Sequence, residues 1–248
     1  MNDAPAGRRS LLLACVFASI GLVALLALGV WQLERKAEKE ALIARIERQL
    51  NAPPSGLPAP KTWSSLESEH EEYRRVRFVA EFIDDEALVY TSGSAFRPDV
   101  VGAGYWVFAP VRLPDGSVVV VNRGFVPEAK KDPATRKTAQ PVDPTEIVGV
   151  VRWPDRPGVF TPSDDPARNL WFTRDPEAIA AAKGWGRVAP FFVEQEGPVL
   201  AGALPQPGRL KPNLRNNHLQ YAITWFGLAL MLIGVLGFWL RARRAENP

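Results

Sequence analysis

One histidine near the end of the chain, His218, stands at the start of a long apolar segment. Helical spacing puts Tyr221, Ala222 and Trp225 on its face, because residues three, four and seven positions apart line one side of an α-helix. A neutral imidazole can ligate iron, and a small residue between two flat aromatic rings suits a planar iron cofactor such as haem. The same residues are also typical of a helix end with an aromatic belt at a membrane surface. Spacing alone leaves both interpretations open.

Two arginines could bind the anionic groups of such a cofactor. Arg215 lies three residues before His218, just outside the apolar segment. Arg123 occurs in the sequence Asn-Arg-Gly-Phe-Val-Pro at 122–127, at the end of a very apolar run. A guanidinium pairs well with carboxylates such as the propionates of haem. The alternative for Arg123 is a structural role, in which it bonds backbone carbonyls in a tight turn.

Few other residues in the sequence could do chemistry. The chain has two histidines and one cysteine, and this Cys15 lies within an apolar segment, as does Met231. The second histidine, His70, is surrounded by glutamates and is expected to be a solvated surface residue. A zinc site or a copper relay is therefore close to excluded. The sequence contains no recognisable nucleophile elbow, phosphate loop or catalytic triad, so we do not expect an enzyme.

Two apolar segments, at residues 11–33 and 216–240, are long enough to cross a membrane. The second has about 22 uncharged residues, which at ~1.5 Å per residue make about 33 Å of helix. Asn217 and Gln220 form a capping-box-like pair at its start. Each segment also carries a strip of small residues that would allow close helix packing in lipid: Ala14, Ala18 and Gly21 in the first, and Gly227, Gly234 and Gly237 in the second.

The charge distribution predicts which side of the membrane holds each part. The two tails hold five arginines (8, 9, 241, 243 and 244) against two acidic residues, and positive tails favour the cytoplasm. Subtracting them from 30 basic and 27 acidic residues leaves 25 of each, so the central part is neutral and has no nucleic-acid-binding footprint. Bulky Val30-Trp31 after a long apolar run favours an uncleaved anchor over a signal peptide. The short N-terminal tail favours a bacterial inner membrane over a mitochondrial one.

The central part has the pattern of a mainly-β domain. Apolar residues alternate over 73–83, and Pro114-Asp115-Gly116 predicts a hairpin between strands at 105–113 and 117–124. Residues 175–184 predict a short helix with Pro at its first position and a terminal Gly. Short strands with Pro/Gly turns predict a β-barrel or sandwich of the α+β type. Further strand candidates are 87–91, 147–153 and 191–194.

The whole chain therefore divides into six expected parts. They are a cytoplasmic tail (1–10), a transmembrane helix (11–33), a helical stalk (34–54), a periplasmic β-rich domain ending in a Pro-rich return strap (55–215), a second transmembrane helix (216–240) and a second cytoplasmic tail (241–248).

Four stretches together resemble the Surf1/Shy1 family. They are Leu-Gly-Val-Trp-Gln-Leu-Glu-Arg at 28–35, Tyr-Trp-Val-Phe-Ala-Pro-Val at 105–111, Val-Asn-Arg-Gly-Phe-Val-Pro at 121–127 and Asn-Asn-His-Leu-Gln-Tyr-Ala-Ile-Thr-Trp-Phe at 216–226. Each alone is a weak signal, but the four occur in the family's order and cover nearly the whole chain. Phe125 departs from the family, which usually has Trp there, and keeps an aromatic ring.

The resemblance implies an assembly factor for cytochrome c oxidase. In bacterial members it implies transient binding of haem a and its handover to the catalytic subunit, with His218 as the axial ligand of the iron. Tyr221 and Trp225 would flank the haem, and Arg215 or Arg123 would lie near its propionates. The expected partners are oxidase subunit I, haem a synthase or other assembly factors, and the lipid bilayer. The alternative is a scaffold that binds oxidase subunits without haem; a membrane-anchored periplasmic enzyme is the least expected.

Overall fold

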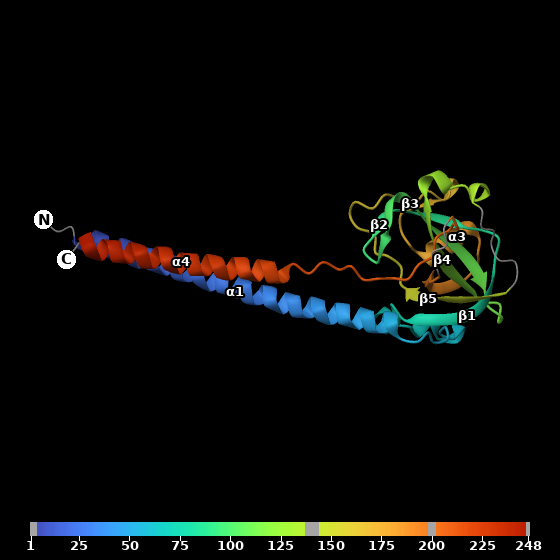
Figure 1. The fold of residues 1–248 in the computed structure, drawn as a ribbon, viewed down its shortest axis with the longest axis horizontal. Coiled ribbons are helices and arrows are strands. Elements are labelled where there is room, and N and C mark those ends of the chain that lie inside the picture. Colours follow the sequence, from blue (N-terminus) through green and yellow to red (C-terminus); the bar gives the residue numbers. More distant parts are fainter. Residues whose placement is uncertain (1–3, 137–143, 198–201, 247–248) are drawn as a thin grey trace. The chain divides into compact units, whose positions relative to one another are not determined.

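The protein consists of two compact units in the computed structural model, which describes residues 4–136, 144–197 and 202–246 (Figure 1). One unit contains Met1–Ala44 and Arg215–Pro248 and is built from two long helices. The other contains Arg45–Leu214 and holds the strands of the described residues. Each unit is considered by itself below.

The first long helix covers both the expected span and the expected helical stalk as far as Asn51. Helix α1 runs from Ala4 to Asn51, so the expected stalk is continuous with the expected span. It ends just before Pro53 and Pro54, because proline lacks the N–H group that a helix interior requires and disfavours helical backbone in the preceding residue. Helix α4 runs from His218 to Glu246.

Both helices have the surface of membrane spans. Leu11–Asn51 and His218–Ala245 are long and apolar enough to cross a bilayer. Their large apolar side chains face outward, with Phe17 71% exposed and Phe238 78% exposed. A helix with apolar side chains on its outer surface is stable in hydrocarbon and not in water. The protein therefore has the predicted architecture, with two membrane helices flanking a mainly-β domain.

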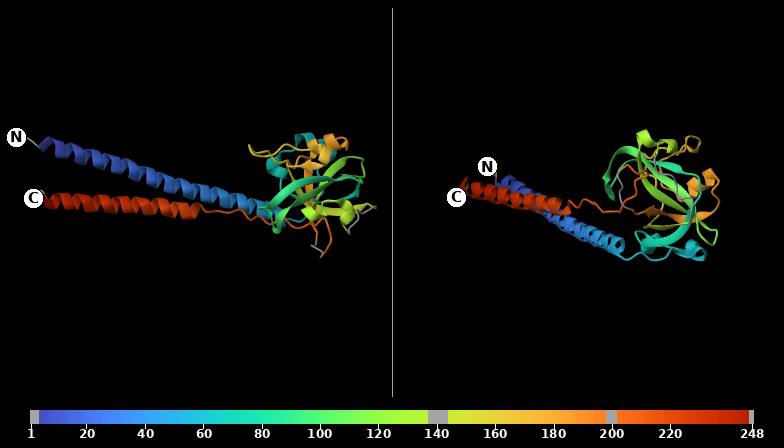
Figure 2. Two further views of the ribbon diagram at one scale, coloured as in Figure 1. Left: turned by 90° about the horizontal axis from the view of Figure 1, so that it is seen from above. Right: turned by 45° about the vertical axis from the view of Figure 1, so that its right-hand side comes forward.

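Five strands of the second unit close into a β-barrel (Figures 1 and 2). They are β1 (Arg75–Phe82), β3 (Arg97–Arg112), β4 (Val118–Pro127), β5 (Thr145–Arg152) and β7 (Val188–Gln195). The order is β1-β5-β7-β4-β3, and the pairing of β1 with β3 closes the ring. Only β4 and β7 are parallel among these described neighbours. This closure decides between the two predicted architectures in favour of a barrel.

Shorter elements surround the barrel. β2 (Ala87–Ser94) and β6 (Leu170–Trp171) extend the sheet beyond β3. The helical elements are η1 (Pro60–Ser65), α2 (Ser68–Glu71), η2 (Glu128–Lys130), η3 (Pro133–Thr135), η4 (Pro166–Arg168) and α3 (Pro176–Lys183).

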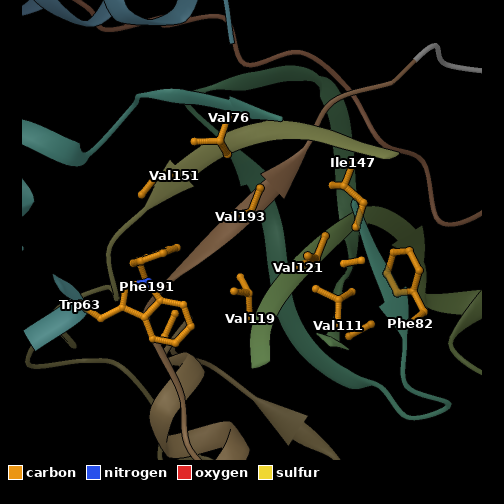
Figure 3. Close-up of a cluster of buried hydrophobic side chains, with 13 residues drawn as sticks. Trp63, Val76, Phe82, Val111, Val119, Val121, Ile147, Val151, Phe191 and Val193 are labelled. Atoms are coloured by element: carbon orange, nitrogen blue, oxygen red, sulfur yellow. The ribbon is translucent and has the colours of Figure 1, made fainter. Parts of the chain in front are cut away.

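The barrel interior is filled by branched and aromatic side chains that point toward one another (Figure 3). Val121, Ile147 and Val193 come from three different strands and are fully buried. The Trp63 ring from η1 meets the Phe191 ring edge-on, with 5.8 Å between ring centroids. A second apolar cluster covers the outer face of β4, so β4 is buried on both faces and its sequence is almost continuously apolar.

Local signals in the sequence predicted several elements correctly. β3 and β4 form the expected antiparallel hairpin. The carboxylate of Asp175 accepts hydrogen bonds from two N–H groups in the first turn of α3, and Gly184 ends that helix at φ +72°. β3 begins earlier than predicted, at Arg97, because pairing with β2 extends it through a stretch whose glycines weaken the strand pattern.

The Pro-rich return strap, residues 197–212, is hydrogen-bonded to the barrel through Gln206; its residues 198–201 lie outside the described residues. The N–H of Gln206 donates to the Phe125 carbonyl at 2.8 Å, and the N–H of Phe125 donates to the Gln206 carbonyl at 3.0 Å. Leu210 is buried in one cluster with the carboxyl end of α1. The strap is thus part of the barrel unit.

A substitution at Gly124 tests this attachment. Gly124 has a φ of +123°, and a Cβ there would collide with the Gln206 carbonyl oxygen. Gly124→Ala should therefore lower the free energy of unfolding by about 2–4 kcal/mol, from backbone strain plus the clash. The control Gly116→Ala, at φ +85° with open space, should cost only the strain, about 1–2 kcal/mol. Thermal unfolding followed by circular dichroism measures both; equal losses would show that the strap contact contributes nothing.

Candidate functional site

His218 is the first residue of α4 and is half-buried. Its N–H group donates to the side-chain oxygen of Asn216 at 3.4 Å. Asn217 occupies the predicted N-cap position, and its backbone carbonyl accepts the first intrahelical bond, from the N–H of Tyr221 at 3.2 Å, while the side-chain bond to the His218 N–H comes from the neighbouring Asn216. The chain carries two adjacent asparagines here, and spacing alone could not tell which side chain turns back onto the first turn.

The imidazole of His218 is bonded to the neighbouring helix. Its Nδ1 lies 2.7 Å from Oε1 of Gln32 on α1. An amide oxygen only accepts hydrogen bonds, so Nδ1 is the donor in this contact, and in the neutral form of the ring the lone pair is on Nε2. Nε2 is therefore the ring atom that can bind a metal, and the contact with Gln32 fixes the direction of the ring.

Sequence reasoning missed Gln32 as a site residue. It lies in the stretch 28–35 that carried part of the family resemblance, directly after the bulk of an apolar segment. The signal that could have identified it is a single amide side chain at the end of an apolar segment. Its partner, however, is 186 positions away in the sequence, so the pairing itself became visible only in the structure.

Pairs of an arginine and a tryptophan mark the two ends of the apolar helix surface. The Arg35 guanidinium lies 5.7 Å from the Trp31 ring centroid, and that of Arg243 lies 4.5 Å from Trp239. Tryptophan and basic residues collect where a membrane meets water. Gln32 follows Trp31 directly, so the pair of Gln32 and His218 lies at the same end of the apolar helix surface as Trp31 and Arg35.

The residues predicted to share a face with His218 differ in exposure. Ala222 is buried at 1% exposed, Trp225 is half-buried and Tyr221 is 56% exposed. Successive residues of a helix are about 100° apart, so Tyr221 and Ala222 lie on opposite sides of the line through His218. Ala222 belongs to the packed side of α4, whereas the Tyr221 ring is free to contact a ligand or lipid.

Close packing of α1 and α4 depends on one glycine of α1. A Cβ at Gly29 would lie 2.5 Å from the Phe226 ring of α4. Ala222 and Ala229 are the buried small residues of α4. The predicted glycine strip of α4 does not make this contact, since among the described residues no atom lies within 4 Å of a Cβ built at any of its members: Gly227, Gly234 and Gly237.

The two candidate arginines occupy different environments. Arg215 is exposed. Arg123 is 8% exposed and its guanidinium lies 5.1 Å from the Phe82 ring centroid. Burial lowers the pKa of Arg123; Glu86 opposes this shift, and Arg136 adds to it. Arg123 thus forms part of the barrel wall.

The remaining histidine is separate from this site. His70 is exposed, as predicted, with 74% of its side chain accessible, and Nδ1 lies 3.3 Å from a Glu67 carboxylate oxygen. Within the described ranges, no group of three or more His, Cys, Asp and Glu side chains could hold a metal ion. A metal at His218 would therefore have to bring most of its own ligands, as the iron of a porphyrin does.

Fold and site together define a membrane protein in which two apolar helices flank a five-stranded barrel and carry a half-buried histidine where one helix begins. The sequence matches the SURF1 family over residues 20–230. Surfeit locus protein 1 of Rattus norvegicus is 34% identical over 81% of this chain and 67% of its own length. That of Homo sapiens is 33% identical over 82% and 69%, and a SURF1-like protein of Monosiga brevicollis is 32% identical over 88% and 82%. The chain belongs to the SURF1 family, which supports a general role in oxidase assembly.

The packing at Gly29 leads to a test of the helix pair. In a Cys15→Ser background, cysteines replacing Gly21 and Leu232 should form a disulfide, because a Cβ at Gly21 would lie 3.6 Å from the Leu232 side chain. Gly29→Leu should reduce the disulfide yield about fivefold or more, since overpacking costs about 1–3 kcal/mol. Gly227→Leu, on the open face of α4, is the matched control and should leave the yield unchanged. Equal yields in both variants would show that Gly29 does not set the helix contact.

Proposed function

We propose that this protein binds haem a through His218 at the outer mouth of its second membrane helix and hands it to the catalytic subunit of a haem-copper oxidase. The observation that supports this most is the 2.7 Å contact between His218 Nδ1 and Gln32 Oε1. It assigns the hydrogen to Nδ1, so that in the neutral imidazole Nε2 is oriented and able to ligate iron. A histidine with both ring nitrogens engaged in hydrogen bonds could not do this.

The surroundings of His218 suit a flat, largely apolar cargo. Trp225 and the exposed Tyr221 offer aromatic rings beside it, and lipid would accept the remaining apolar surface of the porphyrin. His218 would supply a single axial bond. One weak axial bond is easily exchanged, which suits transient binding and transfer better than the permanent two-ligand site of an electron carrier.

A cation at the membrane surface would hold the propionates. Arg215 is exposed and three residues from His218, so its guanidinium can pair with carboxylates in the aqueous layer. Arg123 was the other candidate, but its burial over the Phe82 ring leaves less room for a cargo carboxylate. We therefore assign the propionate contact to Arg215.

The proposed topology is a multi-pass protein of a bacterial inner membrane, with the β-barrel in the periplasm and both termini in the cytoplasm. The start of α1 and the end of α4 lie at the same end of the helix pair (Figure 2), and Arg241, Arg243 and Arg244 are at that end. The proposed partners are oxidase subunit I and haem a synthase or other assembly factors. The proposed role is that of a carrier and not of an enzyme.

One observation favours the alternative, a scaffold that binds oxidase subunits without haem. The turn Gly158–Thr161 is held by an N–H to carbonyl bond of 3.0 Å, and it presents Val159 and Phe160 at 96% and 97% exposed. A fixed turn that exposes two apolar side chains is suited to insertion into a pocket on a partner protein. Subunit I that co-purifies with colourless protein would support this alternative.

Replacing the ligand tests the haem proposal directly. His218→Ala, purified in detergent from cells that make haem a, should lose the haem a absorption band while retaining its thermal unfolding temperature. The control His70→Ala, which removes an exposed side chain, should keep the band. A band of unchanged intensity in His218→Ala would exclude His218 as the iron ligand.

Replacing the surface cation tests the propionate contact. Arg215→Gln should release haem a up to about fivefold faster, because an exposed ion pair contributes about 0.2–1 kcal/mol, and the difference should shrink at high salt. Arg241→Gln, at the other end of α4, should leave the rate unchanged. The rate is measured by transfer of haem to an excess of apomyoglobin. A release rate for Arg215→Gln equal to that of wild type would contradict the assignment.

A further inference from the structure

We propose that Gln32 is the positioning residue for His218: it fixes the tautomer and direction of the imidazole and thereby makes a lone histidine a competent iron ligand. This inference rests on the proposed function, because it concerns the same site. It starts from the pairing of Gln32 Oε1 with His218 Nδ1 at 2.7 Å, a short contact for a nitrogen donor and an oxygen acceptor.

A neutral imidazole in water exchanges its proton between the two nitrogens, and only the nitrogen without the proton can bind a metal. The amide oxygen of Gln32 accepts a hydrogen bond and has no proton to supply, so it selects the form with hydrogen on Nδ1. The same bond turns the ring so that Nε2 points away from α1. Iron-binding histidines are commonly held in this way by an acceptor on the second nitrogen.

The backbone around Gln32 and His218 restricts the conformations that these two side chains can take. Gln32 extends from a regular helix whose neighbouring turn is pinned to α4 by the close approach of Gly29 and Phe226. On the α4 side, the Asn216 carboxamide accepts from the His218 N–H at 3.4 Å and donates to the Lys36 carbonyl of α1 at 3.5 Å. Asn216 therefore ties the first turn of α4 to α1 next to the imidazole, which restricts the positions that the ring can take.

A second consequence follows from the placement of the two residues on different helices. Nε2 is selected as the iron-binding nitrogen only while α1 and α4 are in contact at Gln32 and His218. A partner that separates the helices would remove the acceptor from Nδ1 and weaken the iron bond. Haem retention by His218 is in this way coupled to the packing of the helix pair.

The competing interpretation is that the bond only joins two helices, as polar side chains in membranes often do. The two interpretations differ in what a substitution changes. Loss of a purely structural bond alters helix association, whereas loss of a positioning bond changes the tautomer even when the helices stay together. Gln32→Leu removes the acceptor at similar size, and Gln32→Glu keeps an acceptor oxygen.

The first experiment needs no haem. The chain has only two histidines, so ¹⁵N-histidine labelling in the His70→Ala background yields the ring nitrogens of His218 alone. Spectra of the full-length, haem-free protein in lipid nanodiscs, at about pH 8.5 where an ordinary imidazole is neutral, should show hydrogen on Nδ1. Gln32→Leu should give mixed tautomers, and Gln32→Glu should restore the Nδ1–H form. Gln220→Leu, which changes the nearby glutamine of α4, is the matched control and should match wild type.

The second experiment connects the tautomer to binding. Gln32→Leu should release haem a about 10–100-fold faster than wild type, as is typical when the hydrogen-bond partner of a metal-binding histidine is lost. It should also lower the iron–histidine stretching frequency in resonance Raman spectra of the reduced protein, and Gln32→Glu should reverse both effects. The disulfide between cysteines that replace Gly21 and Leu232 controls for helix separation and should form normally in Gln32→Leu.

The results distinguish failure of the positioning role of Gln32 from failure of the proposed haem binding. Wild-type protein that shows hydrogen on Nε2, or the same tautomer in wild type and Gln32→Leu, would overturn the positioning role whether or not haem binds. An Nδ1–H ring that depends on Gln32 in protein that takes up no haem would overturn the proposed function while supporting the selection of the tautomer. Loss of the cross-link together with the tautomer change would assign Gln32 a structural role and overturn the inference.

Discussion

The close approach of the two membrane helices is the constraint on which the rest of the site depends. Gly29 leaves the space that the Phe226 ring of α4 occupies, and Ala222 adds a small side chain on the packed face. Only at this separation can the Gln32 side chain reach His218. A larger residue at Gly29 would push the backbones apart and break the contact between His218 and Gln32. The two residues of this contact are 186 positions apart in the sequence. The chemistry assigned to one histidine is therefore a property of a helix pair.

The barrel unit fastens both segments that lead to those helices. Leu50, near the end of α1, and Leu210 of the strap are buried in one cluster with Val150 of β5. Arg209 of the strap also donates to the Leu50 carbonyl at 3.1 Å. The two chain segments that leave this unit therefore start from neighbouring points on one wall of the barrel. Buried side chains and hydrogen bonds of this kind limit the conformational freedom of the backbone segments to which they belong.

Local signals in the sequence were sufficient to predict much of this fold. Apolar length predicted the two membrane helices, alternation predicted most strands, and Asp175 with Gly184 predicted the limits of α3. Pairings between distant residues were not predictable in this way: closure by β1 and β3, the two-residue β6 and the bond from Gln32 to His218 all join positions far apart in the chain. The glycine strip of α4 was expected to pack against the other span or a partner, and no described atom lies within 4 Å of a Cβ built at its members, since spacing shows which residues share a side of a helix and not which side meets a neighbour. The sequence predicted His218 as a site residue but not its partner Gln32.

The position of β7 in the sheet determines the order in which the barrel can form. β7 is the last strand of the described residues, yet it lies between β5 and β4 and is parallel to β4. During synthesis the earlier strands can form their hairpin, but the ring stays open and its valines stay solvated until residue 195 has emerged. Folding that waits for a distant strand is slow compared with the pairing of neighbours. The nascent chain thus completes its core only shortly before the final helix is made.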